Sequence, residues 1–153
     1  MYILGDIGNS EIKIFYVNTK NEIVKKINLP TQNLNYKNLN KNFKFLNNDF
    51  KKIEKILFCS VVPKAFNILK NFLSKKTKIK CYEIKNLNLR SLINIDVNFK
   101  QVGSDRLTNA ISLLNNKDNF IILDFGTATT FDVVIKNTYK GGVIAPGLKI
   151  SLN

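Results

Sequence analysis

The chain of 153 residues contains no histidine, no tryptophan, and only two cysteines. Without histidine, neither a Ser-His-Asp nor a Cys-His nucleophile system can be built, and a zinc site with histidine ligands is excluded. Proton transfer at neutral pH therefore falls to a carboxylate, a lysine or a tyrosine. The cysteines, Cys59 and Cys81, belong to no metal-binding or disulfide motif, which is typical of a cytoplasmic protein with reduced thiols.

Acidic residues are also scarce: 11 Asp and Glu stand against 24 Lys and Arg, for a net charge of +13. Proteins that bind nucleic acid often have this balance, but the lysines are spread from Lys13 to Lys149 among many asparagines. No helix-turn-helix, zinc-finger or aromatic RNA-binding motif accompanies them, so we expect no nucleic-acid partner. The positive field still attracts an anionic substrate. No apolar run approaches the length that crosses a bilayer, so no membrane partner is expected.

Two strand-turn-strand segments, each with an acid at the end of its first strand, organise the chain. One reads Asp124-Phe-Gly-Thr-Ala-Thr-Thr-Phe-Asp132, and the other reads Asp6-Ile-Gly-Asn-Ser10. Such a turn can cradle a phosphate with its N–H groups and hydroxyls, and its carboxylate suits a phosphate-bound cation. Either turn alone is also compatible with a plain hairpin. The second copy indicates a duplicated scaffold, in which we expect the two turns to face each other across a cleft.

Periodicity predicts an α/β fold for the first part of the chain. The expected elements are strands at 2–7, 12–17 and 22–29, a helix with Leu39, Phe43 and Leu46 on one face, a strand at 55–62, a helix from Pro63 with Phe66, Leu69 and Leu73 on its core side, and a strand at 80–84. The order β-β-β-α-β-α-β is that of a ribonuclease-H-like (actin-like ATPase) domain.

The second part begins with a polar stretch, 85–98, that has no clear periodicity. A helix is predicted to start at Gly103-Ser-Asp-Arg106, where Ser104 or Asp105 is either its N-cap or part of an anion site with a base beside an arginine. Strands at 120–125, 129–135 and 138–143 then repeat the meander. We therefore predict a first domain at 1–115 and the first strands of a second, similar domain at 116–153.

The apolar positions of that second sheet need a covering layer, which the predicted elements do not supply. The positions are Ile121, Leu123, Phe131, Val133 and Ile135. We therefore expect self-association, or partial disorder after about Gly141.

Five motifs occur in the order and approximate spacing of the type III pantothenate kinases, which the chain resembles. They are Asp6-x-Gly-Asn-Ser, Ser60-Val-Val-Pro63, Gly103-x-Asp-Arg106, Asp124-x-Gly-Thr-Ala-Thr-Thr and Gly141-Gly-x-Ile-x-Pro-Gly147. The resemblance implies a kinase that transfers the γ-phosphoryl group of ATP to the primary hydroxyl of pantothenate, the first step towards coenzyme A. It also implies a homodimer or another form of self-association.

Carried over residue by residue, the resemblance assigns roles to three segments. Pantothenate is expected at Gly103, Ser104, Asp105 and Arg106, with Asp105 as the proton acceptor, kept ionised with the help of Arg106. A monovalent cation, K⁺ or NH₄⁺, is expected at Asp124, and a further ATP contact at Thr127. Magnesium is expected at Asp6 through a phosphate or water, and the ATP phosphates at Asp6, Ile7, Gly8, Asn9, Ser10, Glu11, Ile12 and Lys13.

Two departures from the family pattern leave the substrate open. Family members carry an aromatic residue seven positions before the glycine of Gly103-x-Asp-Arg106 and a proline four before it, where this chain has Asp96 and Phe99. The family's sequences also continue beyond the Pro-Gly turn, so we expect a truncated second domain and little kinase activity from this chain alone. The alternatives are a sugar or acetate kinase of the same superfamily and a non-catalytic regulatory protein with a basic surface.

Overall fold

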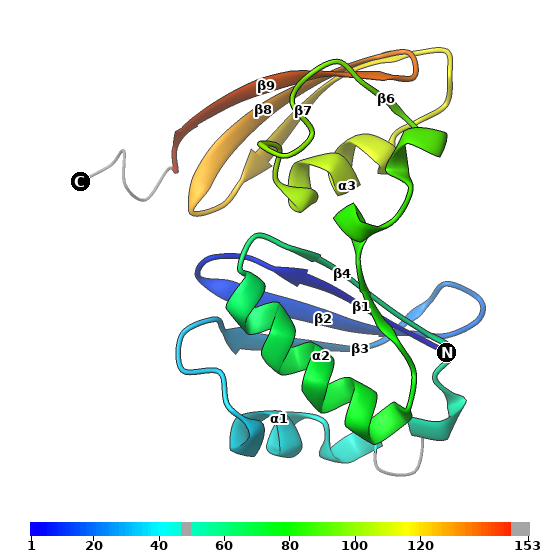
Figure 1. Cartoon of the computed structure of the whole chain (residues 1–153), viewed down its shortest axis with the longest axis vertical. Coiled ribbons are helices and arrows are strands. Elements are labelled where there is room, and N and C mark those ends of the chain that lie inside the picture. The colour runs from blue at the N-terminus through cyan, green and yellow to red at the C-terminus, as the bar shows by residue number, and fades with distance from the viewer. Residues whose placement is uncertain (47–49, 148–153) are drawn as a thin grey trace. The chain divides into compact units, whose positions relative to one another are not determined.

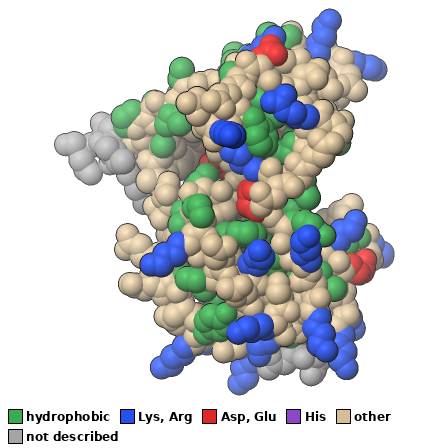
Figure 2. Space-filling model, viewed as in Figure 1, with side chains coloured by type: hydrophobic (Ala, Val, Ile, Leu, Met, Phe, Trp, Pro, Cys, Tyr) green, Lys and Arg blue, Asp and Glu red, His purple; other side chains and the backbone are tan. Residues whose placement is uncertain are grey.

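The computed structural model describes residues 1–46 and 50–147. By its internal contacts the chain divides into two compact units, Met1–Asn86 (unit 1) and Leu87–Asn153 (unit 2), coloured blue to green and green to red in Figure 1. In the described part of the chain, no helix is long and apolar enough to span a membrane. Lysine and arginine side chains are scattered over the face seen in Figure 2 and form no single patch there.

Unit 1 is built on a five-stranded sheet with the order β3-β2-β1-β4-β5. The strands are β1 (Tyr2–Ile7), β2 (Glu11–Val17), β3 (Ile23–Pro30), β4 (Lys55–Ser60) and β5 (Cys81–Glu83). The first three form an antiparallel meander, and β4 and β5 continue the sheet in parallel. This order and these directions are those of a ribonuclease-H-like domain, which confirms the predicted fold class.

Two helices, α1 (Tyr36–Asn42) and α2 (Pro63–Thr77), cover one face of this sheet (Figure 1). They bury the alternate apolar side chains of the strands, since every second strand residue points to the same face. The α2 helix begins at Pro63 as predicted, because a proline at the first helical position loses no hydrogen bond. The α1 helix ends at Asn42, earlier than predicted, and a short 3₁₀ turn at Lys44–Leu46 buries the last apolar residues.

Unit 2 is a four-stranded sheet with the order β6-β9-β8-β7. Its elements are β6 (Asn94–Ile95), α3 (Ser104–Ser112), β7 (Asn119–Phe125), β8 (Ala128–Ile135) and β9 (Thr138–Pro146). The strands β7, β8 and β9 form the predicted second antiparallel meander. The two-residue strand β6 pairs in parallel with β9 and has no counterpart among the predicted elements. The described part of the chain also contains 3₁₀ turns at Phe50–Lys52, Ile84–Asn86 and Leu89–Ser91.

The boundary between the two units differs from the one predicted from the sequence. The units divide after Asn86, whereas the predicted first domain extends to residue 115. The reason is that β6 pairs with β9 and that α3 packs against β8. Helix α3 therefore lies on the sheet of the second meander.

One face of the unit 2 sheet is apolar and exposed, as the sequence predicts. The register places Ile121, Leu123 and Phe125 of β7 on the same face as Val143 of β9. Their side chains are 71%, 48%, 60% and 63% exposed. Helix α3 packs on the other face of the sheet, where Val134 and Tyr139 are fully buried. Among the described residues, no element covers the face that carries Ile121.

Candidate active site

The Asp6 turn of unit 1 is held at several points of its backbone. The N–H of Gly8 donates to the carbonyl of Glu11 at 3.0 Å. Thr31, just after β3, donates its hydroxyl to the Gly8 carbonyl at 2.7 Å and its N–H to the Ser10 carbonyl at 3.1 Å. The turn is therefore fixed by the neighbouring strand, as a preformed phosphate cradle requires.

Asp6 lies beside a basic residue and a thiol. It stands opposite Lys13 in the antiparallel register and next to Cys59 in the parallel register. The thiol of Cys59 donates to Oδ1 of Asp6 at 3.5 Å. Gly5 points to the helix-covered face, where an added Cβ would lie 2.2 Å from the Phe58 ring. The alternation of the strand therefore turns the Asp6 carboxylate to the helix-free face of unit 1.

The other residues predicted to contact the nucleotide differ in accessibility. Ile7 and Ile12 are 0% exposed, so a ligand can reach only their backbone. Asn9, Ser10 and Glu11 are exposed, and Glu11 accepts a hydrogen bond from the Asn28 amide at 2.8 Å. The structure thus brings together Asp6 and Lys13 with the exposed tip of the turn.

The α3 helix places the four predicted pantothenate residues in one turn of backbone. Gly103 is the N-cap residue with extended dihedral angles, and no side chain caps the helix. The interpretation of Ser104 or Asp105 as N-cap is therefore wrong, because both already lie inside the helix. Asp105 is half-buried and accepts the N–H of Arg106 at 2.8 Å. This hydrogen bond engages Oδ1 of the carboxylate.

Arg106 does not make its two-point ion pair with the neighbouring Asp105. Its Nε donates to both carboxylate oxygens of Asp132 at 2.9 and 3.0 Å, and its Nη2 donates to Oδ1 at 2.6 Å. The Tyr139 hydroxyl donates to the same Oδ1. Asp132 is 0% and Arg106 9% exposed, so this ion pair is buried. From the sequence alone, Asp132 is only the last residue of a motif and has no predicted partner.

The pKa values in this cluster follow from the pairing. The Asp132 carboxylate raises the pKa of the Arg106 guanidinium, chiefly through their hydrogen bonds. Burial, followed by the hydrogen bond to Asp132, raises the pKa of the Tyr139 hydroxyl. Arg106 therefore stays charged and Tyr139 stays a hydrogen-bond donor at any physiological pH.

Asp124 lies at the end of β7, where an oxygen-rich group forms. Its Oδ2 accepts a hydrogen bond from the amide of Asn109 on α3 at 2.9 Å. Thr130 stands directly opposite in the register of β8. The Thr130 hydroxyl is buried and has no hydrogen-bond partner in the described structure. A carboxylate next to an unsatisfied hydroxyl is a donor set that suits a hard cation.

The turn between β7 and β8 carries Thr127, the predicted further ATP contact, at its exposed tip. The N–H of Gly126 donates to the Ala128 carbonyl at 3.0 Å. Gly147 packs against this turn so closely that an added Cβ would lie 2.3 Å from the Thr127 carbonyl. The final glycine of the motif Gly141 to Gly147 thus supports the second acidic turn through close backbone packing.

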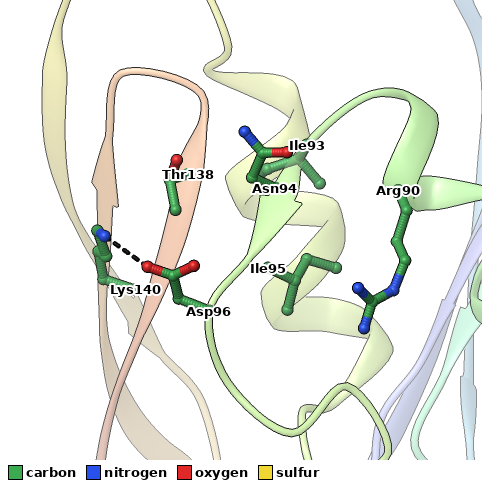
Figure 3. Close-up of a pocket in the computed structure, with 7 residues that line it drawn as sticks. All are labelled: Arg90, Ile93, Asn94, Ile95, Asp96, Thr138 and Lys140. Atoms are coloured by element: carbon green, nitrogen blue, oxygen red, sulfur yellow. Dashed lines mark hydrogen bonds and ion pairs between the residues drawn. The ribbon is translucent and has the colours of Figure 1, made fainter.

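A cavity of about 500 Å³ lies between β6, β9 and the turn that carries Arg90. Figure 3 shows Asp96 and Lys140 on one side of it and Arg90 on the other. Asp96 forms an ion pair with Lys140 at 2.5 Å, and its N–H donates to the Tyr139 carbonyl at 3.1 Å. The residue that stands in place of the family's aromatic side chain is therefore tied to β9.

Comparison with known proteins places these motifs in a family. A family model described as type III pantothenate kinase matches residues 2–153. A type III pantothenate kinase from Pelagibacter ubique is 65% identical over 153 residues, which are 100% of this chain and 62% of that protein. One from Rhizorhabdus wittichii is 39% identical over 104 residues, 66% of this chain and 40% of that protein. The chain thus spans less than two thirds of these relatives.

Solved structures agree on the fold. A protein described as a conserved Baf family transcriptional activator from Campylobacter jejuni matches 97% of this chain and 56% of its own, with a TM-score of 0.54 and 22% identity. A 2-dehydro-3-deoxygalactonokinase from Sinorhizobium meliloti matches 94% of this chain and 54% of its own, with a TM-score of 0.53 and 8% identity. At these identities the likeness shows the fold alone. The family model covers the chain from residue 2 to its end, so the chain belongs to the type III pantothenate kinase family.

Proposed function

We propose that this chain provides the phosphate turn and the catalytic base of an ATP-dependent pantothenate kinase. The observation that carries the proposal is family membership over residues 2–153, with the family's five motifs present in the sequence. Transfer of the γ-phosphoryl group to the primary hydroxyl of pantothenate is the reaction of that family, and gives 4'-phosphopantothenate.

Asp105 is proposed as the proton acceptor for the attacking hydroxyl. In phosphoryl transfer the protein mainly positions the reactants and neutralises charge, and the base takes its proton late. Asp105 lies in the first turn of α3, where the free N–H groups and dipole of the helix favour an anion. Since the chain has no histidine, no imidazole can take over this role.

Magnesium and a monovalent cation are proposed as cofactors. In the described residues no group of three or more Asp, Glu, Cys or His side chains could hold a metal ion alone. The single carboxylate of Asp6 fits a magnesium ion that takes its other ligands from phosphates and water. Asp124, with the unsatisfied Thr130 hydroxyl beside it, fits K⁺ or NH₄⁺. Such ions would neutralise phosphate charge and orient the nucleotide.

The acceptor substrate is the part of the proposal that the sequence leaves most open. Asp96 replaces an aromatic residue and forms an ion pair with Lys140. The assay must therefore distinguish a pantothenate kinase from a sugar or acetate kinase of the same superfamily. The proposal also includes self-association. The exposed apolar face of unit 2 supports it, and the family resemblance separately implies a homodimer.

The test is a coupled assay for ADP release with pantothenate, a panel of sugars and acetate as acceptors. It is run on the 153-residue chain and on a fusion of this chain to the part of the Pelagibacter relative that has no counterpart in it. Asp105→Asn should lower turnover of pantothenate by roughly 10²-fold or more, at an unchanged circular dichroism spectrum. Asp118→Asn, a change at an exposed acid of unit 2, is the matched control and should turn over normally.

Three outcomes would contradict the proposal. If the enzyme prefers a sugar or acetate, pantothenate is not its substrate. If Asp105→Asn is fully active, Asp105 is not the catalytic base. ATP-independent, salt-sensitive DNA binding without phosphorylation, by the chain and by the fusion, would favour the non-catalytic alternative.

A further inference from the structure

A fully buried carboxylate lies in unit 2 outside every residue to which the family resemblance assigns a role. Asp132 of β8 is 0% exposed and accepts three hydrogen bonds from Arg106 and one from Tyr139. Burying an ion pair of this kind costs desolvation that a pair of apolar side chains would avoid. Stability alone therefore does not explain why a carboxylate stands at this core position.

The geometry of β9 brings the tyrosine to this carboxylate. The register shifts between Val133 and Val134, so that Val133 pairs with Gly141 and Val134 with Tyr139. Lys140 is therefore the extra residue of a β-bulge, a feature that commonly re-aims a side chain. Gly142 lies opposite Asp132, and an added Cβ there would come within 1.8 Å of the Phe131 carbonyl oxygen. The strand β9 thus approaches β8 closely beside the ion pair.

The ion pair joins the start of α3 to the middle of the sheet. Arg106 is the third residue of the helix, directly after Asp105. The guanidinium is therefore a direct side-chain link between the first turn of the helix and the strand β8. A cavity of about 200 Å³, lined by Arg106, Tyr139 and Gly142 among others, opens beside the link.

We propose that Asp132 is a positioning residue for the kinase reaction: with Tyr139 it holds the Arg106 guanidinium and thereby fixes the first turn of α3 and the Asp105 carboxylate. The inference rests on the proposed function of Asp105 and adds to it the residues that hold that acid in place. A catalytic group must be held to within about 0.5 Å of its working position, which requires supporting contacts of this kind.

The proposal also changes the role of Arg106. Its charge is already balanced by Asp132, and both Nε and Nη2 are engaged. Its remaining N–H groups are left to donate hydrogen bonds to a substrate oxygen in the 200 Å³ cavity. Arg106 would then orient a substrate oxygen by hydrogen bonding, and would not act as an unpaired anion clamp.

The first arm of the test needs no catalytic turnover. Hydrogen exchange is measured on the full chain as wild type, Asp132→Asn, Tyr139→Phe and the exposed-acid control Asp118→Asn. In Asp132→Asn we expect the protection of α3 amides to fall at least about tenfold further than that of β7 and β8, whose own protection falls with the stability of the unit. Tyr139→Phe keeps the ion pair and should give a smaller change, and the control should give none.

The second arm is kinetic and uses the 153-residue chain or its fusion, whichever is active in the coupled assay. Asp132→Asn should raise KM for pantothenate and lower kcat, each by about tenfold, with KM for ATP unchanged. A merely structural role would lower the amount of folded enzyme and leave both KM values where they are.

Unchanged protection of α3 in Asp132→Asn would overturn the proposal, and so would an equal loss of protection in α3, β7 and β8. Loosened α3 with unaltered pantothenate kinetics in an active enzyme would overturn it as well. If neither the chain nor the fusion phosphorylates pantothenate, the proposed function fails, and the exchange arm still decides whether Asp132 anchors the helix.

Discussion

The buried ion pair between Arg106 and Asp132 yields a stability prediction whose size follows from the structure. Asp132→Asn keeps the shape of the side chain and removes its charge. Arg106, 9% exposed, then loses the carboxylate with which it forms its ion pair. Breaking a buried pair from one side costs about 3–5 kcal/mol, because the remaining charge stays desolvated. That is a large part of the roughly 5–15 kcal/mol by which a domain is stable.

The assay is urea unfolding followed by circular dichroism, with hydrogen exchange to assign the transition to unit 2. With a slope of about 1 kcal/mol per molar urea for so small a unit, the midpoint should fall by about 3 M or more. The double replacement Arg106→Met with Asp132→Leu removes both charges. Made in a Tyr139→Phe background, so that no hydroxyl loses its acceptor, it should come within about 1 kcal/mol of that background, or exceed it.

A cost below about 1 kcal/mol for Asp132→Asn would refute this reasoning, since it would mean that water or another group compensates Arg106. A double replacement as unstable as the single one would show instead that the pair stabilises the unit directly. Recovered stability with lost pantothenate turnover is the pattern that the positioning role requires.

Four further predictions concern other parts of the chain. Asp6→Asn should weaken binding of magnesium-ATP in isothermal titration, and equal affinity would refute the role of that turn. Replacing K⁺ by Na⁺ should lower activity in the chain or its fusion, whichever is active; equal rates would mean that Asp124 only shapes its turn. Ile121→Lys, on the exposed apolar face, should reduce self-association measured by light scattering. Ile144→Lys, similarly exposed on the opposite face of the sheet, is the control and should not. If the two variants behave alike, the face that carries Ile121 is not the interface. Burial raises the pKa of Cys81 from 9.0 to about 11, so the folded state holds the thiol proton more tightly than the unfolded one. The protonated thiol therefore contributes roughly 2–3 kcal/mol to the free energy of unfolding below pH 9, and this contribution is lost by about pH 11. The stability difference between wild type and Cys81→Ala should change over this pH range, and a constant difference would refute the prediction.

Local patterns allowed much of the fold to be predicted. The alternation of Ile12, Ile14 and Tyr16 and the proline at the start of α2 are local sequence signals, and the strand and the helix that they predict are confirmed. The strand at Asn94–Ile95 was missed because two residues carry no period and because it forms only through pairing with β9. The division of the chain after Asn86 also depends on such pairing, since it follows from where β6 and α3 pack.

The sequence predicted those residues of the candidate site that lie within short motifs, but not the partners that are distant along the chain. Asp105 and Arg106 were found as a local motif, but the partner of Arg106 is 26 residues away. One signal could have identified it: Asp132 interrupts an apolar strand at a position whose register faces the core. A charged residue there requires a buried counter-charge, and Arg106 is the arginine nearest to it in the sequence.

The parallel pairing of β1 with β4 has a consequence for the nascent chain. The hairpins of β1, β2 and β3 join residues that leave the ribosome together, and such local contacts form early. Cys59, the residue that donates to Asp6, is synthesised 53 residues later. The Asp6 turn is thus shaped within the first 31 residues, up to Thr31, whereas the surroundings of its carboxylate are completed only when β4 inserts beside β1. A ribosome-bound chain shorter than about 60 residues would present the turn with Asp6 still open to solvent on that side.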